Sequence, residues 1–384
     1  MRRLLLVLAL AGAFVPASGA SAAVPRGWLG VSFGPQYVAA HARPTLASEL
    51  RRMRRSGVQS ARFALYWNQL QPYQSMDAVP AARRHEFRVV EGIPTDLRFT
   101  DRLVGIAARR RLPLMPVLLG APAWATDDPN RPVYVPRDPA QFARFAGMLV
   151  RRYGPGGSFW SEHPSIARLP IRSWQIWNEV SNSWYWDSTW RTAYPRLLRA
   201  GYDAIKAVDP QAHVLMSGLN TGESGPSWQV LEVLYEQLDA QRLGRPFDQV
   251  AAHIYTRRVP DAAKVVEETR KVMERHGDDR PIRVTELAWP AARGRLRDER
   301  GHKREFFAAT TDRGMAKRLV RGIKLLAGKR KALGISGVDW FQWASSYKGT
   351  TDAFSYSGLR RARHKRLTDK PAMQAFRLVA KQLR

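Results

Sequence analysis

The chain has no cysteine among its 384 residues. This absence excludes disulfides, thiolate metal sites and a cysteine nucleophile. The eight histidines form no HxH or HExxH pattern, so the sequence does not predict a metal site. We therefore expect neither a metal nor an organic cofactor.

Acidic residues are scarce: 33 Asp and Glu stand against 62 Lys and Arg, which gives a net charge of +29. One interpretation is non-specific attraction to an anionic partner, such as a cell-envelope polymer. The other is compositional bias, because only 12 of the basic residues are lysines and the arginines are spread along the chain. The densest basic clusters, residues 51–55 and 360–366, contain no interleaved aromatics. We therefore expect no nucleic-acid partner.

Long apolar runs are also missing, except near the N-terminus. There, Arg2-Arg3 precedes the apolar residues 4–15, and Ala20-Ser21-Ala22 offers a small-x-small cleavage site. This pattern is typical of a secretory signal peptide, and its apolar run is too short to span a bilayer. We expect residues 1–22 to be removed and residues 23–384 to form one domain. The mature protein is then expected to be secreted or envelope-associated, without a transmembrane segment, and monomeric.

The mature chain alternates between short apolar runs and amphipathic stretches. The strand-like runs end near Phe33, Leu65, Leu119, Asn178, Leu219, Tyr255, Glu286 and Gln342. The helix-like stretches are residues 46–55, 99–111, 139–153, 189–208, 228–243, 262–276, 315–333 and 371–383. Runs without polar alternation indicate strands that are buried on both faces. Eight such units without a glycine-rich phosphate loop predict an α/β fold, a single-domain (β/α)8 TIM barrel.

Two of the apolar runs end in a glutamate. One closes with Asn178-Glu179, and the other closes with Glu286. In a barrel the C-terminal ends of the strands meet at one face, which brings these carboxylates together. A glycosidase needs such a pair, one acid to protonate the leaving oxygen and one carboxylate to attack the sugar. We predict Glu179 as the acid/base and Glu286 as the nucleophile.

One detail of this prediction is geometrically strained. Asn178 and Glu179 are adjacent, and a regular strand would point them to opposite faces. Both can reach the site only where the strand ends or bulges. If it does, Asn178 is placed to hydrogen-bond the 2-hydroxyl of the sugar.

Further polar and aromatic side chains fall in the same predicted layer, and we predict that they bind substrate: Asn178, Arg62, Trp67, Trp124, Trp184, Trp186, His253, Tyr255, Trp340 and Trp343. Arg62, Tyr255 and His253 are donors that could keep Glu286 ionised, although each also has an ordinary structural explanation. Trp184 and Trp186 follow the acid and suit a sugar platform or a packed rim loop equally well. Trp340 and Trp343 are three residues apart, so a regular strand cannot aim both inward.

Five segments in order are similar to clan A of the glycoside hydrolases, most closely to proteins related to families 39 and 5. They are residues 174–179 with Asn182, residues 248–255, residues 284–290, residues 340–343, and residues 357–359 with Lys370-Pro371. The resemblance implies a retaining (β/α)8 enzyme with Glu179 on strand four and Glu286 on strand seven. It also implies that Tyr255 and Arg62 are partners of the nucleophile, that Asn178 contacts the 2-hydroxyl, and that a strand-eight tryptophan lies at the sugar.

The chain departs from these relatives in two places. Val180 follows the acid where relatives often have proline, and residues 118–125 lack the histidine that family 5 members often carry after strand three. The second departure argues against close membership of family 5.

The sequence thus predicts a secreted retaining glycosidase that hydrolyses a β-linked oligo- or polysaccharide by double displacement. The alternative is a catalytically silent barrel that binds anionic cell-envelope polysaccharide, since one fold can bind without cleaving.

Overall fold

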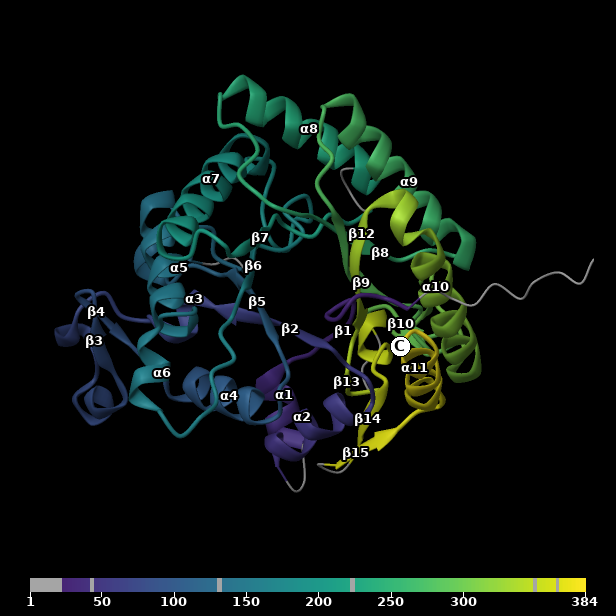
Figure 1. Cartoon of the computed structure of the whole chain (residues 1–384), viewed down its shortest axis with the longest axis horizontal. Coiled ribbons are helices and arrows are strands. Elements are labelled where there is room, and N and C mark those ends of the chain that lie inside the picture. The colour runs from purple at the N-terminus through teal and green to yellow at the C-terminus, as the bar shows by residue number, and fades with distance from the viewer. Residues whose placement is uncertain (1–22, 42–44, 130–132, 222–224, 348–350, 364–365) are drawn as a thin grey trace, which may run out of the picture.

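The computed structural model describes residues 23–41, 45–129, 133–221, 225–347, 351–363 and 366–384 (Figure 1). The predicted signal peptide, residues 1–22, lies outside the described residues. No helix in the described ranges has the length and apolar character needed to cross a membrane.

Eight parallel strands form the centre of the molecule. They are β1 (Leu29–Ser32), β2 (Ser60–Tyr66), β5 (Leu114–Leu119), β6 (Ser173–Ile176), β7 (His213–Leu215), β8 (Val250–Ile254), β9 (Ile282–Leu287) and β12 (Ile335–Phe341). Their order is β7-β6-β5-β2-β1-β12-β9-β8. Isolated bridges join Leu215 to Gln249 and Leu219 to Ala252, so the two edges of this sheet meet. The predicted (β/α)8 barrel is confirmed.

Helices surround these strands in a ring (Figure 1). The long ones are α2 (Leu46–Arg55), α4 (Arg98–Arg109), α5 (Pro139–Tyr153), α7 (Trp190–Val208), α8 (Ser227–Ala240), α9 (Val259–Arg275), α10 (Asp312–Leu333) and α11 (Pro371–Gln382). The short ones are α1 (Pro35–His41), α3 (Trp67–Leu70) and α6 (Ser158–Glu162), with 3₁₀ turns at residues 76–78, 81–86, 123–125 and 353–356. Small ribbons are formed by β3 (Arg88–Val90) with β4 (Ile93–Thr95), by β10 (Leu296–Arg297) with β11 (Lys303–Arg304), and by β13 (Ala344–Ser345), β14 (Arg360–Arg363) and β15 (Arg366–Asp369).

Capping residues explain several helix boundaries. The Thr45 side chain accepts a hydrogen bond from the Ser48 amide at the start of α2. Asp138 caps α5 in the same way, with Pro139 in the first turn. These side chains satisfy amides that have no partner within the helix. α10 ends at Gly334, whose φ of 63° is a left-handed conformation that glycine adopts without steric cost.

The barrel interior is partly polar. Arg62 and Met115 are register partners on adjacent parallel strands, so their side chains lie on the same face of the sheet. Met115, Leu215 and Ala251 form a small buried apolar cluster that is separate from the main core. Arg62 extends across the barrel to Gln175 and Glu286. Charged groups therefore take interior positions that apolar side chains would otherwise fill.

Candidate active site

Glu286 reaches the barrel interior because β9 carries an irregularity. Ala252 pairs with Val284, whereas the next residue of β8, His253, pairs with Glu286. β9 thus has one extra residue, Thr285, at this point. Such a bulge reorients the side chain that follows it, and here Glu286 comes to lie beside His253.

The end of β6 explains how the adjacent side chains of Asn178 and Glu179 can both reach the site. The strand stops at Ile176, and both Trp177 and Glu179 have positive φ, 69° and 42°. A left-handed backbone at two non-glycine residues interrupts the alternation of the strand, so Asn178 and Glu179 can both contact the site. Trp177 is completely buried and holds this turn against the core.

Two donors hydrogen-bond the Glu286 carboxylate, and His253 lies beside it. Arg62 Nη1 donates to Oε1 at 2.7 Å, and the Tyr255 hydroxyl donates to Oε2. His253 Nδ1 lies 3.6 Å from Oε2. Arg62 is itself held in place, because its Nη2 donates to Asn178 Oδ1 at 2.7 Å and its Nε donates to Gln175 at 2.8 Å.

These contacts set the charge of Glu286. Burial alone would raise the pKa of its carboxyl group. The charges of His253 and Arg62, together with the hydrogen bonds from Tyr255 and Arg62, outweigh burial and hold the pKa below its usual value. Glu286 is therefore ionised at neutral pH.

Glu179 has a different set of neighbours. His253 Nδ1 lies 2.7 Å from Oε1, and Asn182 Nδ2 donates to Oε2 at 3.0 Å. No arginine or lysine pairs with this carboxylate in the described part of the chain. One side-chain atom of each of Glu179, His253 and Glu286 lies within 4.8 Å of the others, so the two carboxylates face each other across His253.

His253 fits between the carboxylates because Gly218 lies against it. A Cβ atom at Gly218 would lie 1.9 Å from His253 Nε2, well inside van der Waals contact. The imidazole is fully buried, which differs from our prediction that His253 binds substrate. Its position instead suits a residue that holds both carboxylates in place.

A pocket of about 250 Å³ opens above Glu286. Its lining includes the predicted residues Arg62, Asn178 and Glu286. It also includes residues outside the predicted set: Ser32, Tyr66, Tyr185, Phe341 and Gln342. Tyr185 lies between two tryptophans that were selected, so the aromatic segment was recognised but its inward residue was not.

Most of the predicted tryptophans lie away from this pocket. Trp67 is buried against Phe145, because α3 begins at Trp67 and turns it out of the strand. Trp124 contacts Trp67, and both line a separate cavity of about 100 Å³. Trp186 packs under Trp177. These positions explain the difference from the prediction, because the rings of Trp67 and Trp186 are buried in the core and that of Trp124 packs against it.

The tryptophans of strand eight are also structural. Trp340 and Trp343 are fully buried. Trp340 donates to the Ser357 carbonyl at 3.2 Å, and Trp343 donates to the Glu49 carboxylate at 3.1 Å. Phe341 takes the place at the pocket where we expected a tryptophan. Trp184, by contrast, is 59% exposed and is not among the residues that line the pocket.

The trio Glu179, His253 and Glu286 also has the composition of a cation site. The chemistry of its surroundings does not fit one. Both oxygens of Glu286 already accept hydrogen bonds, and the Arg62 guanidinium at 2.7 Å would repel a metal ion.

A GxSxG pattern occurs at residues 30–34, with Ser32 at its centre. In serine hydrolases this serine lies on a sharp turn and hydrogen-bonds a histidine. Here Ser32 lies within β1, and its hydroxyl interacts with Arg62 and the Thr285 carbonyl, each at 3.4 Å. This arrangement does not activate a serine nucleophile.

Comparison with known proteins gives no match to a protein-family model, and no curated protein matches. Solved structures do match. A family 39 glycoside hydrolase from Bacteroides cellulosilyticus WH2 has a TM-score of 0.60 and 16% identity over 93% of this chain and 64% of its own. A monomeric β-xylosidase from Caulobacter crescentus CB15 has a TM-score of 0.63 and 14% identity, and the match covers 93% of this chain and 69% of the xylosidase. A GH39 enzyme from Xanthomonas axonopodis pv. citri has a TM-score of 0.62 and 18% identity, and the match covers 93% of this chain and 66% of that enzyme.

The chain thus spans 64–69% of the length of these three proteins. Enzymes of families 51, 53 and 5 also share its architecture. Likeness at this level of identity establishes the fold. The predicted resemblance to the (β/α)8 barrels of the glycoside hydrolases, with family 39 proteins among the matches, is confirmed at that level.

Proposed function

We propose that this chain is a retaining O-glycoside hydrolase that cleaves a β-linked oligo- or polysaccharide. One observation carries the proposal: carboxylate oxygens of Glu179 and Glu286 lie within 4.8 Å of each other at the mouth of the barrel. Retaining enzymes place the two carboxyl groups about 5–5.5 Å apart, whereas inverting enzymes need about 6.5–9.5 Å to admit a water molecule.

The different surroundings of the two carboxylates support different roles. Glu286 contacts a guanidinium group and a phenolic hydroxyl, which favour the ionised form that a nucleophile requires. Glu179 lacks an arginine or lysine partner in the described residues, and we assign it the proton-transfer role. Distinct environments for two acids are how glycosidases divide the work between them.

In the first step, a Glu286 oxygen attacks the anomeric carbon. The glycosidic C–O bond breaks, and the proton of Glu179 passes to the leaving oxygen. In the second step, water attacks the same carbon and gives a proton to Glu179, and the ester bond to Glu286 breaks to restore its carboxylate. The anomeric configuration is inverted twice and is therefore retained.

Asn178 supports the same chemistry. Its Oδ1 accepts a hydrogen bond from Arg62, and its NH₂ group has no protein partner in the described part of the chain. Because Asn178 lines the pocket, this NH₂ group is available to a sugar hydroxyl. A hydrogen bond to the 2-hydroxyl that strengthens at the transition state would contribute directly to the rate.

The β-linkage and the location of the enzyme are parts of the proposal with their own support. The β-xylosidase from Caulobacter crescentus shares the fold, and this similarity supports a β-linked substrate for the present chain. The N-terminal pattern favours export, in which case the substrate is an extracellular or envelope glycan.

The nucleophile can be tested with a panel of activated 2-fluoro β-glycosides and intact-protein mass spectrometry. We expect an adduct on the wild type, localised to the peptide that contains Glu286, and none on Glu286→Ala. Glu236→Gln, at an exposed glutamate on α8, is the matched control and should react like the wild type. An adduct on another carboxylate would overturn the assignment, and the absence of both adducts and hydrolysis would favour the silent barrel.

The acid/base role of Glu179 has a separate test. Glu179→Ala should lower kcat/KM for substrates with poor leaving groups by about 10²–10⁴-fold, the usual contribution of general acid catalysis. Substrates with good leaving groups should lose far less, because their departure needs no proton. Added azide should restore turnover and yield a glycosyl azide, since azide needs no general base. Equal losses for good and poor leaving groups, without azide rescue, would contradict this role.

A further inference from the structure

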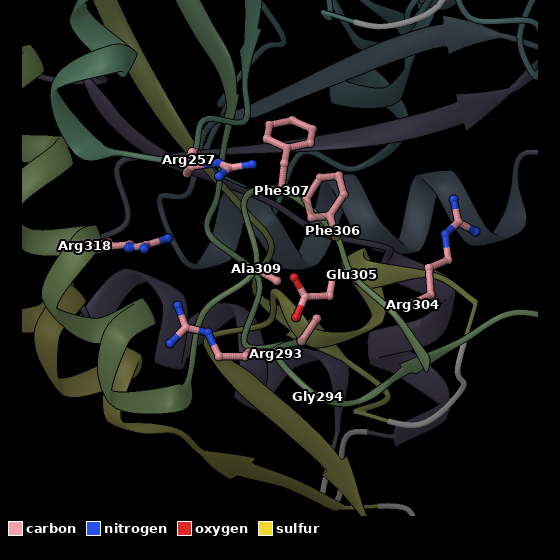
Figure 2. Close-up of a pocket in the computed structure, with 10 residues that line it drawn as sticks. Arg257, Arg293, Gly294, Arg304, Glu305, Phe306, Phe307, Ala309 and Arg318 are labelled. Carbon is pink, nitrogen blue, oxygen red and sulfur yellow. The ribbon is translucent and has the colours of Figure 1, made fainter. Parts of the chain in front are cut away.

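A third cavity, of about 190 Å³, lies between the long β9–α10 loop, Arg257 after β8 and Arg318 on α10. Four arginines line it: Arg257, Arg293, Arg304 and Arg318. The only carboxylate among its lining residues is Glu305. Figure 2 shows Arg257, Arg293 and Arg318 on one side of this space and Phe306 and Glu305 on the other, with the Arg304 guanidinium beyond them.

These arginines have no direct ion-pair partner in the described residues, although the charge of Arg304 also acts on Asp298, outside the cavity. None of the four guanidinium groups forms an ion pair within the described residues, and Arg318 has only a long hydrogen bond, 3.4 Å, to the Ala308 carbonyl. Burial, and then the positive charge of Arg293, lower the pKa of Arg318. The positive charges of Arg293 and Arg318 therefore repel each other, with Glu305 as the one carboxylate of the lining, and a bound anion would relieve the repulsion.

The cavity is adjacent to the candidate active site. Arg257 follows Tyr255 by two residues at the end of β8. The ring of Phe354 lies 4.7 Å from that of Tyr255 and 5.5 Å from that of Phe306, measured between centroids. A single aromatic ring therefore separates the partner of Glu286 from the wall of the arginine cavity.

We propose that this cavity is an anion subsite, which binds a carboxylate, or a sulfate or phosphate ester, carried by a sugar of the glycan substrate. Guanidinium groups match such oxyanions in charge and in bidentate geometry. Phe307 is 47% exposed at the rim and offers an apolar face to a sugar ring. The substrate class is then an acidic glycan, and its placement beside Glu179 and Glu286 rests on the proposed function.

Calorimetry on the full chain carrying Glu286→Gln tests binding apart from cleavage. The probes are a β-linked oligoglucuronate, the same oligosaccharide with its carboxyl groups reduced to alcohols, and a sulfated β-glucan oligosaccharide. At least one of the two charged probes should bind more tightly than the neutral one, and the comparison between them identifies the anion. Arg293→Gln with Arg318→Gln should weaken that binding by roughly tenfold to a hundredfold, the size expected for lost hydrogen bonds to a charged group.

The matched control is Arg51→Gln with Arg54→Gln. It removes the same charge from exposed positions on α2, a helix of the outer ring far along the chain from the cavity, and should leave binding unchanged. Equal weakening by both double variants would overturn the proposal in favour of general attraction to a basic protein. So would equal affinity for charged and neutral probes.

Hydrolysis by the wild type separates the subsite from the proposed function. Arginine-dependent binding of a charged probe that the wild type does not cleave would leave the subsite standing and refute the hydrolase for that glycan. Cleavage of charged and neutral probes with equal kcat/KM, unaffected by Arg293→Gln with Arg318→Gln, would support the hydrolase and overturn the subsite.

Discussion

The barrel encloses two buried pairs of an arginine and a carboxylate, and they are built differently. In the upper pair, Arg62 uses one nitrogen for Glu286 and spreads the others over Asn178 and Gln175. In the lower pair, Arg283 holds both oxygens of Asp339, with Nε at 2.8 Å and Nη2 at 2.9 Å.

The lower pair is closed on itself. Asp339 is completely buried, and Ser60 lies within hydrogen-bonding distance of both partners. A Cβ at Gly30 would lie 1.9 Å from Asp339, and one at Gly337 would lie 2.2 Å from Arg283, so two glycines make room for the pair. The Asp339 carboxylate is therefore closed to solvent, whereas the Arg283 side chain keeps 10% of its surface exposed.

The upper pair faces a pocket, and its carboxylate is bound one oxygen at a time by different donors. Under the proposed function, this difference separates an ion pair that supports the fold from one that supports chemistry. A nucleophile must be kept ionised and yet reachable, which excludes the bidentate grip that saturates Asp339. The positions agree with the general rule for these barrels, in which the C-terminal face carries the reaction and the opposite face carries stability.

The sharpest test of the comparison is Glu286→Gln. We expect kcat/KM to fall by about four orders of magnitude or more, as when a covalent nucleophile is lost. The folded structure should persist, because the amide can still accept from Arg62. Kinetics with an activated aryl glycoside and circular dichroism on one preparation would check both. Activity within tenfold of the wild type would show that Glu286 is not the nucleophile.

Asp339→Asn should lower the stability of the fold and leave the activity unchanged, the reverse of what we expect for Glu286→Gln. It leaves the Arg283 charge buried without a partner, which costs about 3–5 kcal/mol of unfolding free energy. Below the unfolding transition, kcat/KM should match the wild type. Denaturant unfolding measures the loss, with Asp77→Asn, at an exposed position that has no ion pair among the described residues, as the control. A large loss of activity without a loss of stability would mean that the lower pair also serves the reaction.

Much of this architecture is predictable from sequence, because apolar runs and amphipathic stretches follow directly from burial. Seven strand ends and the helices 46–55 and 139–153 appear within two residues of the predicted positions, whereas β7 ends at Leu215 and only an isolated bridge forms at Leu219. Glu179 and Glu286 also come together as expected, since both follow apolar runs and parallel strands share one open face.

The inward aromatic residues could not be predicted in the same way. A tryptophan suits a sugar platform and a packed core equally well, and only the three-dimensional neighbours decide between them. Phe341 faces the pocket while its neighbour Trp340 packs outside the barrel. The direction of Glu286 depends on the bulge at Thr285, and that of Glu179 depends on two positive φ angles. Neither leaves a pattern in the sequence.

Gly218→Ala tests whether the upper pair depends on His253. The new methyl group would lie 1.9 Å from Nε2, so the imidazole or the backbone must move. Misplacing a reacting group by about 1 Å can cost about 10²-fold in rate, and we expect kcat/KM to fall by roughly that factor. Gly156→Ala, where a Cβ meets nothing within 4 Å, is the control and should keep full activity. If Gly218→Ala is fully active, His253 does not position the carboxylates.

The smallest effect should come from Tyr255→Phe, which removes one donor from Glu286 and leaves Arg62 in place. That hydrogen bond helps to lower the pKa of Glu286, so its loss raises the pKa and shifts the acid limb of kcat/KM to higher pH. At acidic pH the variant should fall below the wild type by roughly tenfold, the size of one hydrogen bond to a charged group, and the gap should narrow as pH rises. The pH profile of kcat/KM decides the matter. A uniform loss at all pH values would mean that Tyr255 acts on the sugar, and the upper pair would then keep its charge through Arg62 and His253 alone.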